Sequence, residues 1–575
     1  MVNYPGMNTP PSSTSRVDLS GDPNIFPNTG IALATRTLAD HVNWLAVVDQ
    51  LLPWDAARAR IAPSVVLLML VINVLTQHNP LYHVELWAES LPLPILWGEG
   101  ITAHQFNDDA LGRVLEDLAD HGRTLLATLG LRMRAVHDAG PAMLHTDTTA
   151  FALCGDYPNQ DTGPTAPVAL TWGHSKDHRP DLRQIMAGLT VDDAGCVLGG
   201  AMLSGKTSDR AWHPEWLDQL SQDFPDDFWK DSFYIADSAL IAEPALLKIR
   251  ELGMQWLGRL PATFGLCDRL KDQVRATEDP WAPLGTLAAK PKSATATYQA
   301  HTFDTTLYDQ PARAFVYHSS ALDKKKEHTL QREIAREAQT LEKTAKKLAK
   351  QVFHCAEDAT AASETRVQTA KIRWHTVTPA IRTQAVPVRT RGRQKAGTEP
   401  ETVTQYTVQW HWTAPTPERV QAERARRATF VLMTSQMTCD AQTALHEYKA
   451  QDQDEHGFRW MKSPIHLSAF FLEKPTRIVG LGYLLLLALQ FARFMRAMVR
   501  QAMVDQPPLE LPDHRKIVRP SEAVILDALR TVWVERKEEE AMVWYQWTHV
   551  KPHVWRILEM LQIPIQHRFQ WDPSG

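Results

Sequence analysis

Two β-prone runs of this chain each carry an aspartate, and this placement limits the folds that the chain can adopt. Asp147 stands inside the run 142–156, and Asp237 directly follows the apolar run 232–236. A carboxylate in a buried strand is costly unless it is paired, bound to a metal ion or placed at the strand end. We therefore expect each of these two acids to be paired, bound to a metal ion or placed at the end of its strand.

The sequence pattern changes near Gly140. Residues 31–131 carry apolar side chains at helical spacing, which predicts an all-α region. Residues 141–261 hold strand-length apolar pieces, with helical pieces late in the run, which predicts an α/β or α+β core. The tail 520–568 is rich in Trp and His, and we predict that it is helical.

Length and composition exclude several classes of protein. A chain of 575 residues exceeds one ordinary hydrophobic core and predicts several domains. Its 44% apolar and 22% charged residues exclude a mostly disordered, collagen-like or disulfide-scaffold protein. Its five cysteines form no CxxC motif, which argues against a cysteine zinc site and favours a reducing compartment.

Two apolar runs need a membrane check. Ile61–Leu75 and Ile478–Ala492 are both shorter than the roughly 20 residues that a membrane-spanning helix needs. We expect both to be buried core helices, and we expect no membrane partner.

The segment 262–427 differs from its surroundings and resembles an insertion. It combines strand-like pieces with a charged helical stretch, and residues 323–395 hold 17 Lys and Arg against 8 Asp and Glu, a net charge of +9. The whole chain carries −5, so the remaining residues carry −14. A basic segment of this kind is either a solvated helix face or a phosphate-binding surface.

A third acid, Glu455, lies on a predicted helix from about residue 441 to 462. At about 100° per residue, Tyr448, Gln451, Glu455 and Lys462 fall within about 60° of one another and share one face. Asp452 lies on nearly the same face and is the alternative acid. Carboxylates from two strands and one helix suit two Mg²⁺ or Mn²⁺ ions about 3.5–4 Å apart, the arrangement of two-metal phosphoryl transfer.

The spacing Tyr448-x2-Gln451-x3-Glu455-x6-Lys462 resembles the Tyr-x2-Arg-x3-Glu-x6-Lys signature of DDE transposases of the insertion-sequence-four superfamily, found in bacterial insertion sequences. The separation of Asp147 and Asp237 is typical of that group. Short sequence motifs also resemble those of one branch of this superfamily: HTDTT, WGHSKDHRPDLRQI, LSGKTSD, FYIADSAL and YKAQDQDEHGFRWMKSP. The resemblance is strong over residues 141–261 and 429–503, and weak over the N-terminal helices.

This resemblance implies an α/β fold: an RNase H-like catalytic core interrupted by a β-rich insertion, with helical regions at both ends. The expected order follows the chain. It comprises a disordered leader (1–30), a helical domain for DNA-end binding and dimerisation (31–139), the first part of the core (140–261), the insertion with strands and a basic helix (262–427), the second part of the core (428–503) and a C-terminal helical region (504–575).

The resemblance also implies roles for individual residues. Asp147, Asp237 and Glu455 would be the catalytic, metal-binding triad for two Mg²⁺ ions, with Mn²⁺ as a substitute. Tyr448 and Lys462 would contact DNA near the cut. Gln451 replaces the usual Arg, so its phosphate contact would carry no charge. DNA-binding residues are also expected in HSKDHRP, where Lys176, His178 and Arg179 either contact phosphate or form a polar turn.

The implied function is a transposase that binds terminal inverted repeats and cleaves and transfers DNA strands. Its partners would be transposon-end and target DNA and a second copy of the chain, in the bacterial cytoplasm at the nucleoid. Alternatives are a decayed or domesticated transposase that only binds DNA, an RNase H-like nuclease of another process, and a helical structural protein.

Three further side chains have both a structural and a functional interpretation. Trp410 and Trp412 in QWHWT are expected to be core residues, although related enzymes use an aromatic wedge beside a flipped base. His145, two residues before Asp147, is expected to be packed in the core and not to bind the metal.

Overall fold

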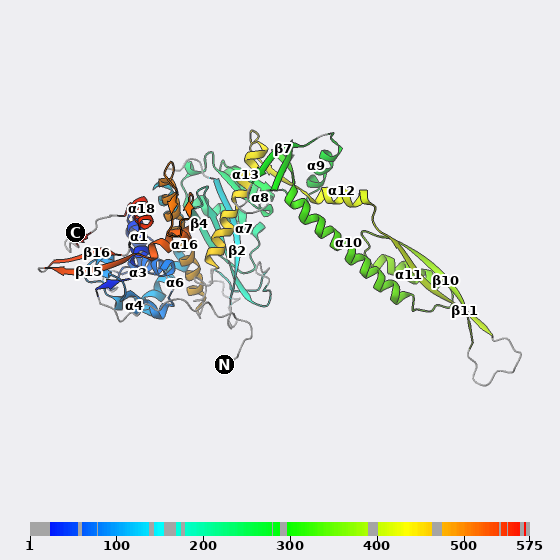
Figure 1. The fold of residues 1–575 in the computed structure, drawn as a ribbon, viewed down its shortest axis with the longest axis horizontal. Helices are drawn as coiled ribbons and strands as arrows, with labels where there is room; N and C mark the ends of the chain where they lie inside the picture. Colours follow the sequence, from blue (N-terminus) through cyan, green and yellow to red (C-terminus); the bar gives the residue numbers. More distant parts are fainter. Residues whose placement is uncertain are drawn as a thin grey trace. The chain divides into compact units, whose positions relative to one another are not determined.

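The computed structural model describes residues 24–55, 60–76, 79–136, 143–153, 168–173, 179–278, 280–287, 296–388, 401–462, 474–539, 542–548, 550–563 and 568–570, with the side chains of 287, 452–455, 539, 542 and 568–570 excepted. The chain divides into two compact units. Unit 1 comprises residues 1–258 and 446–575, and unit 2 comprises residues 259–445. Figure 1 follows the chain through both units. Lys176, His178, most of the predicted leader and the basic loop 389–400 lie outside the described residues.

Unit 1 begins with a set of helices, which confirms the predicted N-terminal helical region. These helices are α1 (Thr29–His41), α2 (Trp44–Leu51), α3 (Pro63–Thr76), α4 (Leu81–Ala88), α5 (Leu93–Trp97) and α6 (Asp108–Val136), with a 3₁₀ turn η1 (Ala103–Gln105) between the last two. The apolar spacing of α6 buries one side of the helix, including Leu111, Leu115, Leu118 and Leu125.

A mixed sheet forms the centre of unit 1. Its strands are β2 (Met143–Leu153), β3 (Arg183–Val191), β4 (Val197–Ser204), β5 (Phe233–Ala236) and β6 (Gln255–Arg259), in the spatial order β4-β3-β2-β5-β6. β2, β3 and β4 pair antiparallel, whereas β2, β5 and β6 pair parallel. The helices α7 (Asp209–Asp223) and α8 (Glu243–Glu251) precede β5 and β6, as parallel crossovers require.

Different helices cover the two faces of this sheet. A Cβ atom on Gly188 would overlap the ring of Trp212, so α7 lies directly on one face. On the other face, a Cβ atom on Gly200 would lie 3.2 Å from Leu486 of α16 (Pro475–Ala502). Side chains alternate between faces along a strand, so consecutive residues of β2 and β3 belong to opposite helix layers.

The helix α16 is buried along most of its length. A Cβ atom on Gly480 would overlap the carbonyl oxygen of Leu115, so the backbones of α16 and α6 approach each other closely. α16 is long and apolar enough to cross a membrane by length and composition, but its apolar window is entirely buried inside the protein. The run that forms α3 is also buried, so the prediction that both apolar runs form core helices is confirmed.

The C-terminal part of unit 1 departs from the prediction of a helical tail. It contains α17 (Glu522–Arg530) and α18 (Pro552–Met560), but also the strands β15 (Trp533–Glu539), β16 (Met542–Thr548) and β17 (Arg568–Gln570). β15 and β16 form an antiparallel hairpin, and the aromatic and β-branched residues of β16 favour extended pairing. A smaller hairpin pairs β13 (Leu509–Glu510) with β14 (Lys516–Ile517).

The predicted leader, residues 1–30, is not wholly disordered. Ile25–Phe26 forms β1, which pairs with β15, and α1 already begins at Thr29. The tertiary partner of β1 is more than 500 residues away in sequence, so local composition could not reveal this pairing.

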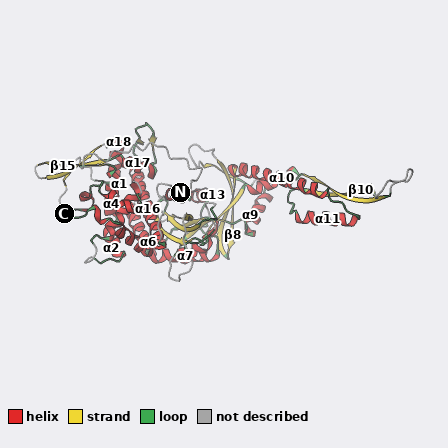
Figure 2. Ribbon diagram, turned by 90° about the horizontal axis from the view of Figure 1, so that it is seen from below, coloured by secondary structure: helices red, strands yellow, loops and turns green. Residues whose placement is uncertain are grey.

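Unit 2 contains a second set of strands and a helical arm. The strands β12 (Thr429–Thr434), β9 (Gln310–Ser319), β8 (Ala296–Leu307) and β7 (Ala282–Leu287) pair in that order. Figure 2 shows the arm, in which the hairpin of β10 (Thr376–Pro387) and β11 (Thr402–Thr413) lies beside helices. The helices of unit 2 are α9 (Gly265–Ala276), α10 (Ser320–Leu348), α11 (Ala356–Thr369) and α12 (Pro417–Arg427), and α13 (Ala441–Ala450) leads back to unit 1.

Candidate active site

Asp147 and Asp237 each directly follow the last paired residues of two adjacent parallel strands. The pairing of β2 with β5 runs from Met143–Phe233 to Thr146–Ala236 with a constant offset. One further step along this register reaches Asp147 on β2 and Asp237 at the end of β5. Neighbouring strands lie about 4.8 Å apart, so the two acids that sequence analysis selected are brought together.

Local backbone donors hold each carboxylate. The Asp147 Oδ1 accepts a hydrogen bond from the amide of Thr148 at 2.7 Å. The Asp237 Oδ1 accepts one from the amide of Ala239 at 2.8 Å and thereby caps the 3₁₀ turn η3 (Ser238–Leu240). Asp147 is half-buried and Asp237 is exposed, so the pair opens toward solvent from one end of the sheet.

A buried hydrogen-bond chain fixes β2 just before Asp147. The hydroxyl groups of Thr146 and Thr190 lie 2.9 Å apart, and the Trp216 indole donates to Thr190 Oγ1 at 2.8 Å. Thr146 faces α7, so Asp147 faces the opposite layer. The chain ties β2 and β3 to α7 and leaves the Asp147 side of the sheet available for the site.

The helix α14 (Asp452–Met461) lies over this same side. Leu189 of β3 is the cross-strand partner of Asp147, so their side chains share one face. A Cβ atom on Gly457 would lie 3.4 Å from Leu189, 3.2 Å from Leu489 and 2.9 Å from Arg493, so the α14 backbone packs closely there. Glu455 stands two residues earlier on α14, and its side chain lies outside the described part of the chain.

The predicted continuous helix 441–462 is two helices. α13 ends at Ala450 and α14 begins at Asp452, with Gln451 between them. Gln451 keeps helix-like backbone angles, φ −54° and ψ −18°, so the change is a short interruption and not a reversal of direction. Its amide nitrogen is buried and has no hydrogen-bond partner among the described residues.

Lys462 ends α14 above the strand that carries Asp147. Its ammonium nitrogen lies 5.8 Å from the centre of the Phe151 ring, and Phe151 follows Asp147 by four residues on β2. The cation therefore lies on the Asp147 face. Tyr448 is half-buried on α13 and makes contacts of its own.

The family described as "Transposase DDE domain" matches residues 147–491, which is 345 of the 575 residues. The chain belongs to this DDE transposase family. The matched range begins at Asp147, and it includes Asp237 and Glu455. A family described as a domain of unknown function, DUF4277, matches residues 35–129, which lie in the N-terminal helices.

No curated protein matched the chain. Among solved structures, the chain is similar to the cryo-EM structure of a piggyBac transposase synaptic complex with hairpin DNA. That likeness covers 88% of this chain and 80% of the other at 9% identity, and its TM-score of 0.34 is too low to carry an argument.

Arg179 of this transposase already has an acidic neighbour. Its guanidinium donates to both carboxylate oxygens of Asp181, at 2.9 and 2.7 Å, and this ion pair lowers the pKa of Asp181. Both side chains are exposed, so a phosphate would compete with Asp181 in water. The phosphate contacts expected for Lys176 and His178 concern positions outside the described residues.

His145 packs in the core of the transposase. The imidazole is fully buried, and neither ring nitrogen has a hydrogen-bond partner among the described residues. Burial lowers the pKa of His145 to about 4. The ring is therefore neutral at pH 7 and adds no charge beside the two aspartates.

Trp410 is a core residue of unit 2. It is buried against Leu341, Leu348 and Val408, and its indole donates to Ser363 Oγ at 2.9 Å. Trp412 packs, partly buried, against the same cluster. The structural interpretation of these two side chains is thereby supported, and Trp410 offers no free ring as a wedge.

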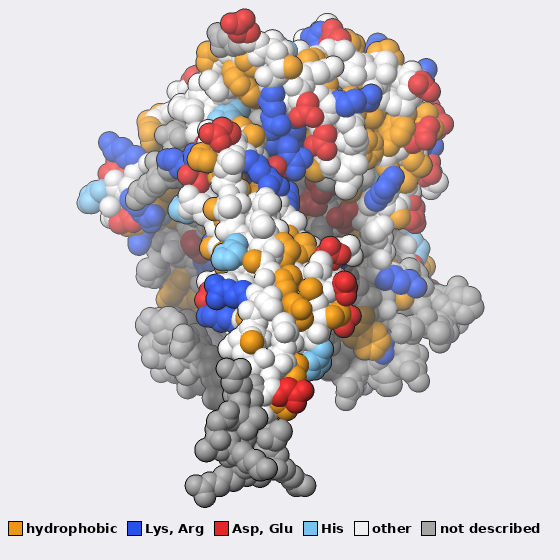
Figure 3. All heavy atoms as spheres, turned by 90° about the vertical axis from the view of Figure 1, so that its right-hand side faces the viewer, with side chains coloured by type: hydrophobic (Ala, Val, Ile, Leu, Met, Phe, Trp, Pro, Cys, Tyr) orange, Lys and Arg blue, Asp and Glu red, His pale blue; other side chains and the backbone are white. Residues whose placement is uncertain are grey.

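The basic segment 323–395 is partly ion-paired. Its Arg373 pairs with Glu423 at 3.1 Å. Its acids Asp323 and Glu333 pair with Arg424 and Arg427, which follow the segment, at 2.7 and 2.9 Å. On α10, Lys346 pairs with Glu342 at 2.6 Å. Figure 3 likewise shows acidic and basic side chains side by side on the face that it draws. The Lys346–Glu342 pair is typical of a solvated helix face, and the segment keeps its excess of basic side chains.

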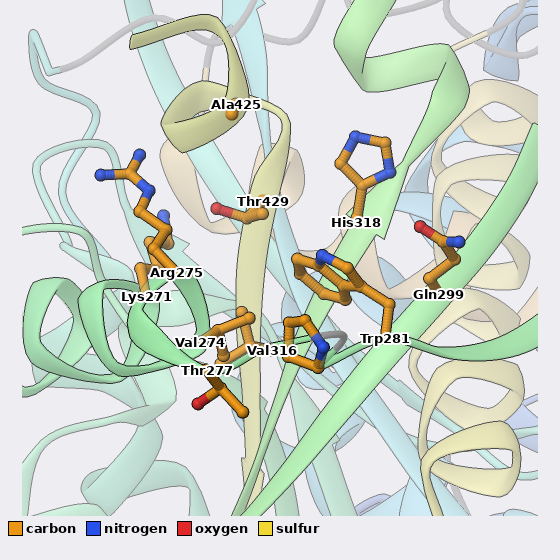
Figure 4. Close-up of a pocket in the computed structure, with 11 residues that line it drawn as sticks. Lys271, Val274, Arg275, Thr277, Trp281, Gln299, Val316, His318, Ala425 and Thr429 are labelled. Atoms are coloured by element: carbon orange, nitrogen blue, oxygen red, sulfur yellow. The ribbon is translucent and has the colours of Figure 1, made fainter. Parts of the chain in front are cut away.

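Unit 2 also contains a cavity of about 290 Å³ between α9, β8, β9 and β12, shown in Figure 4. Gln299, His318 and Thr429 form a cross-strand row along one wall. Burial lowers the pKa of Lys271 on the opposite wall. The cavity contains none of the three predicted catalytic acids.

The donor set at the Asp147 end of the sheet suits a hard divalent cation. Two carboxylates at neighbouring positions repel each other, and a cation between them removes this repulsion. No group of three or more His, Cys, Asp or Glu side chains is placed to hold a metal ion within the described residues.

Sequence reasoning missed Gly457, although a glycine inside a helical pattern signals a close backbone contact.

Proposed function

We propose that this chain is an active transposase of a bacterial insertion sequence, with an RNase H-like core. It would bind terminal inverted repeats and catalyse metal-dependent strand cleavage and strand transfer. The neighbouring positions of Asp147 and Asp237 carry the proposal, because each directly follows the last paired residues of β2 and β5, and α14 packs on Leu189, the cross-strand partner of Asp147. Membership of the DDE transposase family supports the same chemistry.

Asp147, Asp237 and Glu455 would hold two Mg²⁺ ions, with Mn²⁺ as a substitute. When bound, such ions activate a water or 3′-hydroxyl and stabilise the leaving oxygen. The chain itself contributes position: Thr148 and Ala239 amides orient the two aspartates, and α7 anchors β2. A neutral His145 keeps the core beneath the site free of competing charge.

DNA would lie along the Asp147 face. Lys462 would neutralise a phosphate there, while Tyr448 and Gln451 would contact the same strand from the α13–α14 junction. Arg179 would contact phosphate only after it exchanged its partner Asp181 for the phosphate, and Lys176 and His178 remain further candidates.

We propose a homodimer on paired transposon ends, acting at the bacterial nucleoid.

Strand cleavage tests this proposal. A labelled duplex that carries the inverted repeats flanking the gene is incubated with Mg²⁺ or Mn²⁺ and with wild type, Asp147→Asn, Asp237→Asn or Glu455→Gln. Asp227→Asn, an exposed acid outside the site, is the matched control. We expect metal-dependent cuts at the repeat ends with wild type and the control. Each of the other three variants should lose cleavage by at least about 100-fold while still binding DNA.

Two results would contradict parts of the proposal. Wild-type binding without cleavage would identify a decayed, DNA-binding transposase. Normal cleavage by Glu455→Gln would exclude Glu455 as a metal ligand, and Asp452→Asn would then be the next variant to assay.

A further inference from the structure

A large aromatic side chain is exposed near one end of the sheet in unit 1. Trp172, in the segment 168–173 before β3, has 52% of its surface exposed. Trp54, at 40%, is the other tryptophan among the exposed large apolar side chains of the described residues. A tryptophan ring buries a large apolar area when it is covered, so a rigidly held, exposed ring is a candidate contact for a partner.

The backbone beneath Trp172 is held on both sides. Thr171 and Gln184 exchange backbone hydrogen bonds of 3.3 and 2.9 Å, and Gly205 donates to the carbonyl of Ala169 at 3.1 Å. A Cβ atom on Gly173 would overlap the carbonyl oxygen of Gly205, so no larger residue fits there. The indole is therefore presented by a fixed piece of chain.

A cation covers one face of this ring. The Arg183 guanidinium lies 4.4 Å from the centre of the Trp172 ring. Its Nη1 donates to the carbonyl of Leu170 at 3.2 Å, which orients the side chain. The pair is a flat aromatic surface backed by a positive charge, and half of the indole stays in water.

The strand register connects this pair to the proposed active site. The Thr171–Gln184 bridge places Trp172 opposite Arg183, and Arg183 is opposite Leu153 of β2. Leu153 is six residues after Asp147, so both residues face the same side, about 20 Å apart. Lys462 lies between them, over Phe151.

We propose that Trp172 and Arg183 form a stacking platform for an unpaired base of the DNA bound at the site. This inference rests on the proposed function. Every nucleobase has a π-face that stacks on an indole, and a guanidinium adds cation–π attraction and charge for the phosphate. A base inside a duplex has both faces covered by its neighbours, so the platform selects unpaired nucleotides. Along the strand direction the platform lies about 20 Å from Asp147, so it would hold a nucleotide away from the cut and not the one that is cleaved.

The test compares single-stranded with double-stranded DNA. Fluorescence anisotropy measures binding of the full-length chain to a labelled twelve-nucleotide oligothymidine and to a labelled twelve-base-pair duplex. The proteins are wild type, Trp172→Ala, Trp172→Phe and the matched control Trp54→Ala. We expect Trp172→Ala to weaken oligothymidine binding roughly 5- to 150-fold and duplex binding less than about twofold. Trp172→Phe keeps a ring and should retain most of the affinity.

Three outcomes overturn the platform: unchanged oligothymidine affinity in Trp172→Ala, an equal loss for single-stranded and duplex DNA, or the same loss in Trp54→Ala. Thermal unfolding of each variant shows whether a loss reflects misfolding, in which case Trp172→Phe decides. Metal-dependent cleavage of the inverted-repeat duplex is measured on the same wild-type preparation. Absent cleavage counts against the proposed function, whereas normal cleavage with unchanged oligothymidine binding counts against the platform alone.

Discussion

Asp147 and Asp237 directly follow Thr146 and Ala236, the last paired residues of β2 and β5. Two adjacent carboxylates raise each other's cost of ionisation, because like charges repel at short range. The sheet tolerates this arrangement at an open end, where Asp237 is exposed. Either removal of one carboxylate charge or binding of a cation should relieve this repulsion. Only the protein that keeps both carboxylates should become more stable when divalent metal is added.

Asp147→Asn and Asp237→Asn should each abolish stabilisation by divalent metal. Without metal, each variant should be as stable as wild type or slightly more stable, because one repulsion is gone. With Mg²⁺ at about 100 times its Kd, wild type should gain about 2.7 kcal/mol of unfolding free energy. Thermal unfolding with and without Mg²⁺ measures both effects. An equal metal response in wild type and both variants would place the metal elsewhere, and Asp227→Asn serves as the control.

Gly480→Ala should destabilise the protein by about 2 kcal/mol or more, because the added Cβ atom meets the backbone of Leu115 and separates α16 from α6. This cost opposes the gain of up to about 1 kcal/mol that alanine brings to a helix interior. Urea denaturation measures the difference. Gly265→Ala, at the open start of α9, is the matched control and should be neutral or slightly stabilising. Equal stability of both variants would refute the close contact.

The substitution Glu522→Gln should lower the free energy of unfolding most at neutral pH. Burial raises the pKa of Glu522, but Arg496 and Arg493 lower it further, so the net pKa lies below the ordinary value of 4.5. The ionised form therefore adds stability above pH 4.5, and this stability is lost as the pH falls through the lower folded-state pKa. At pH 7 we expect a loss of about 3 kcal/mol, because two buried arginines lose their counter-charge.

The difference between wild type and Glu522→Gln should shrink below pH 4.5 in denaturant titrations at several pH values. Glu538→Gln, at the exposed pair of Glu538 with Arg536, is the control and should cost about 0–1 kcal/mol at any pH. A pH-independent difference for Glu522→Gln would show that its packing, and not its charge, matters.

Trp410→Phe should lower stability without affecting DNA cleavage. The substitution removes the indole donor to the buried Ser363 hydroxyl, which should cost about 1–2 kcal/mol. A double-mutant cycle with Ser363→Ala measures the coupling of the two side chains. A large fall in cleavage with unchanged stability would instead make Trp410 a DNA contact.

Local patterns predicted the parts of the fold that depend on nearby residues. The apolar runs that became β2, β3 and β5 have strand length, and the spacing in α6 is helical, so each element could be read directly. The two aspartates were selected by family resemblance, and their strand placement agreed with it. The register that joins them depends on pairing across the sheet, which no local pattern specifies.

The remaining features depend on distant contacts. β1 pairs with β15 at the other end of the chain, and the hairpin of β15 and β16 replaces the predicted helices. The approach of α14 to Leu189 depends on Gly457 meeting a strand more than 200 residues earlier. Sequence periodicity reports which face of an element is apolar, but not the element that will cover it.

The close contact of α6 with α16 has a consequence for the inheritance of this gene. The two family matches, residues 35–129 and 147–491, end inside these two helices. Gly480 of one matched region touches Leu115 of the other. Recombination that transferred either region alone would expose a large apolar surface in the recipient. The two regions should therefore be inherited together, and related genes that encode one of them should also encode the other.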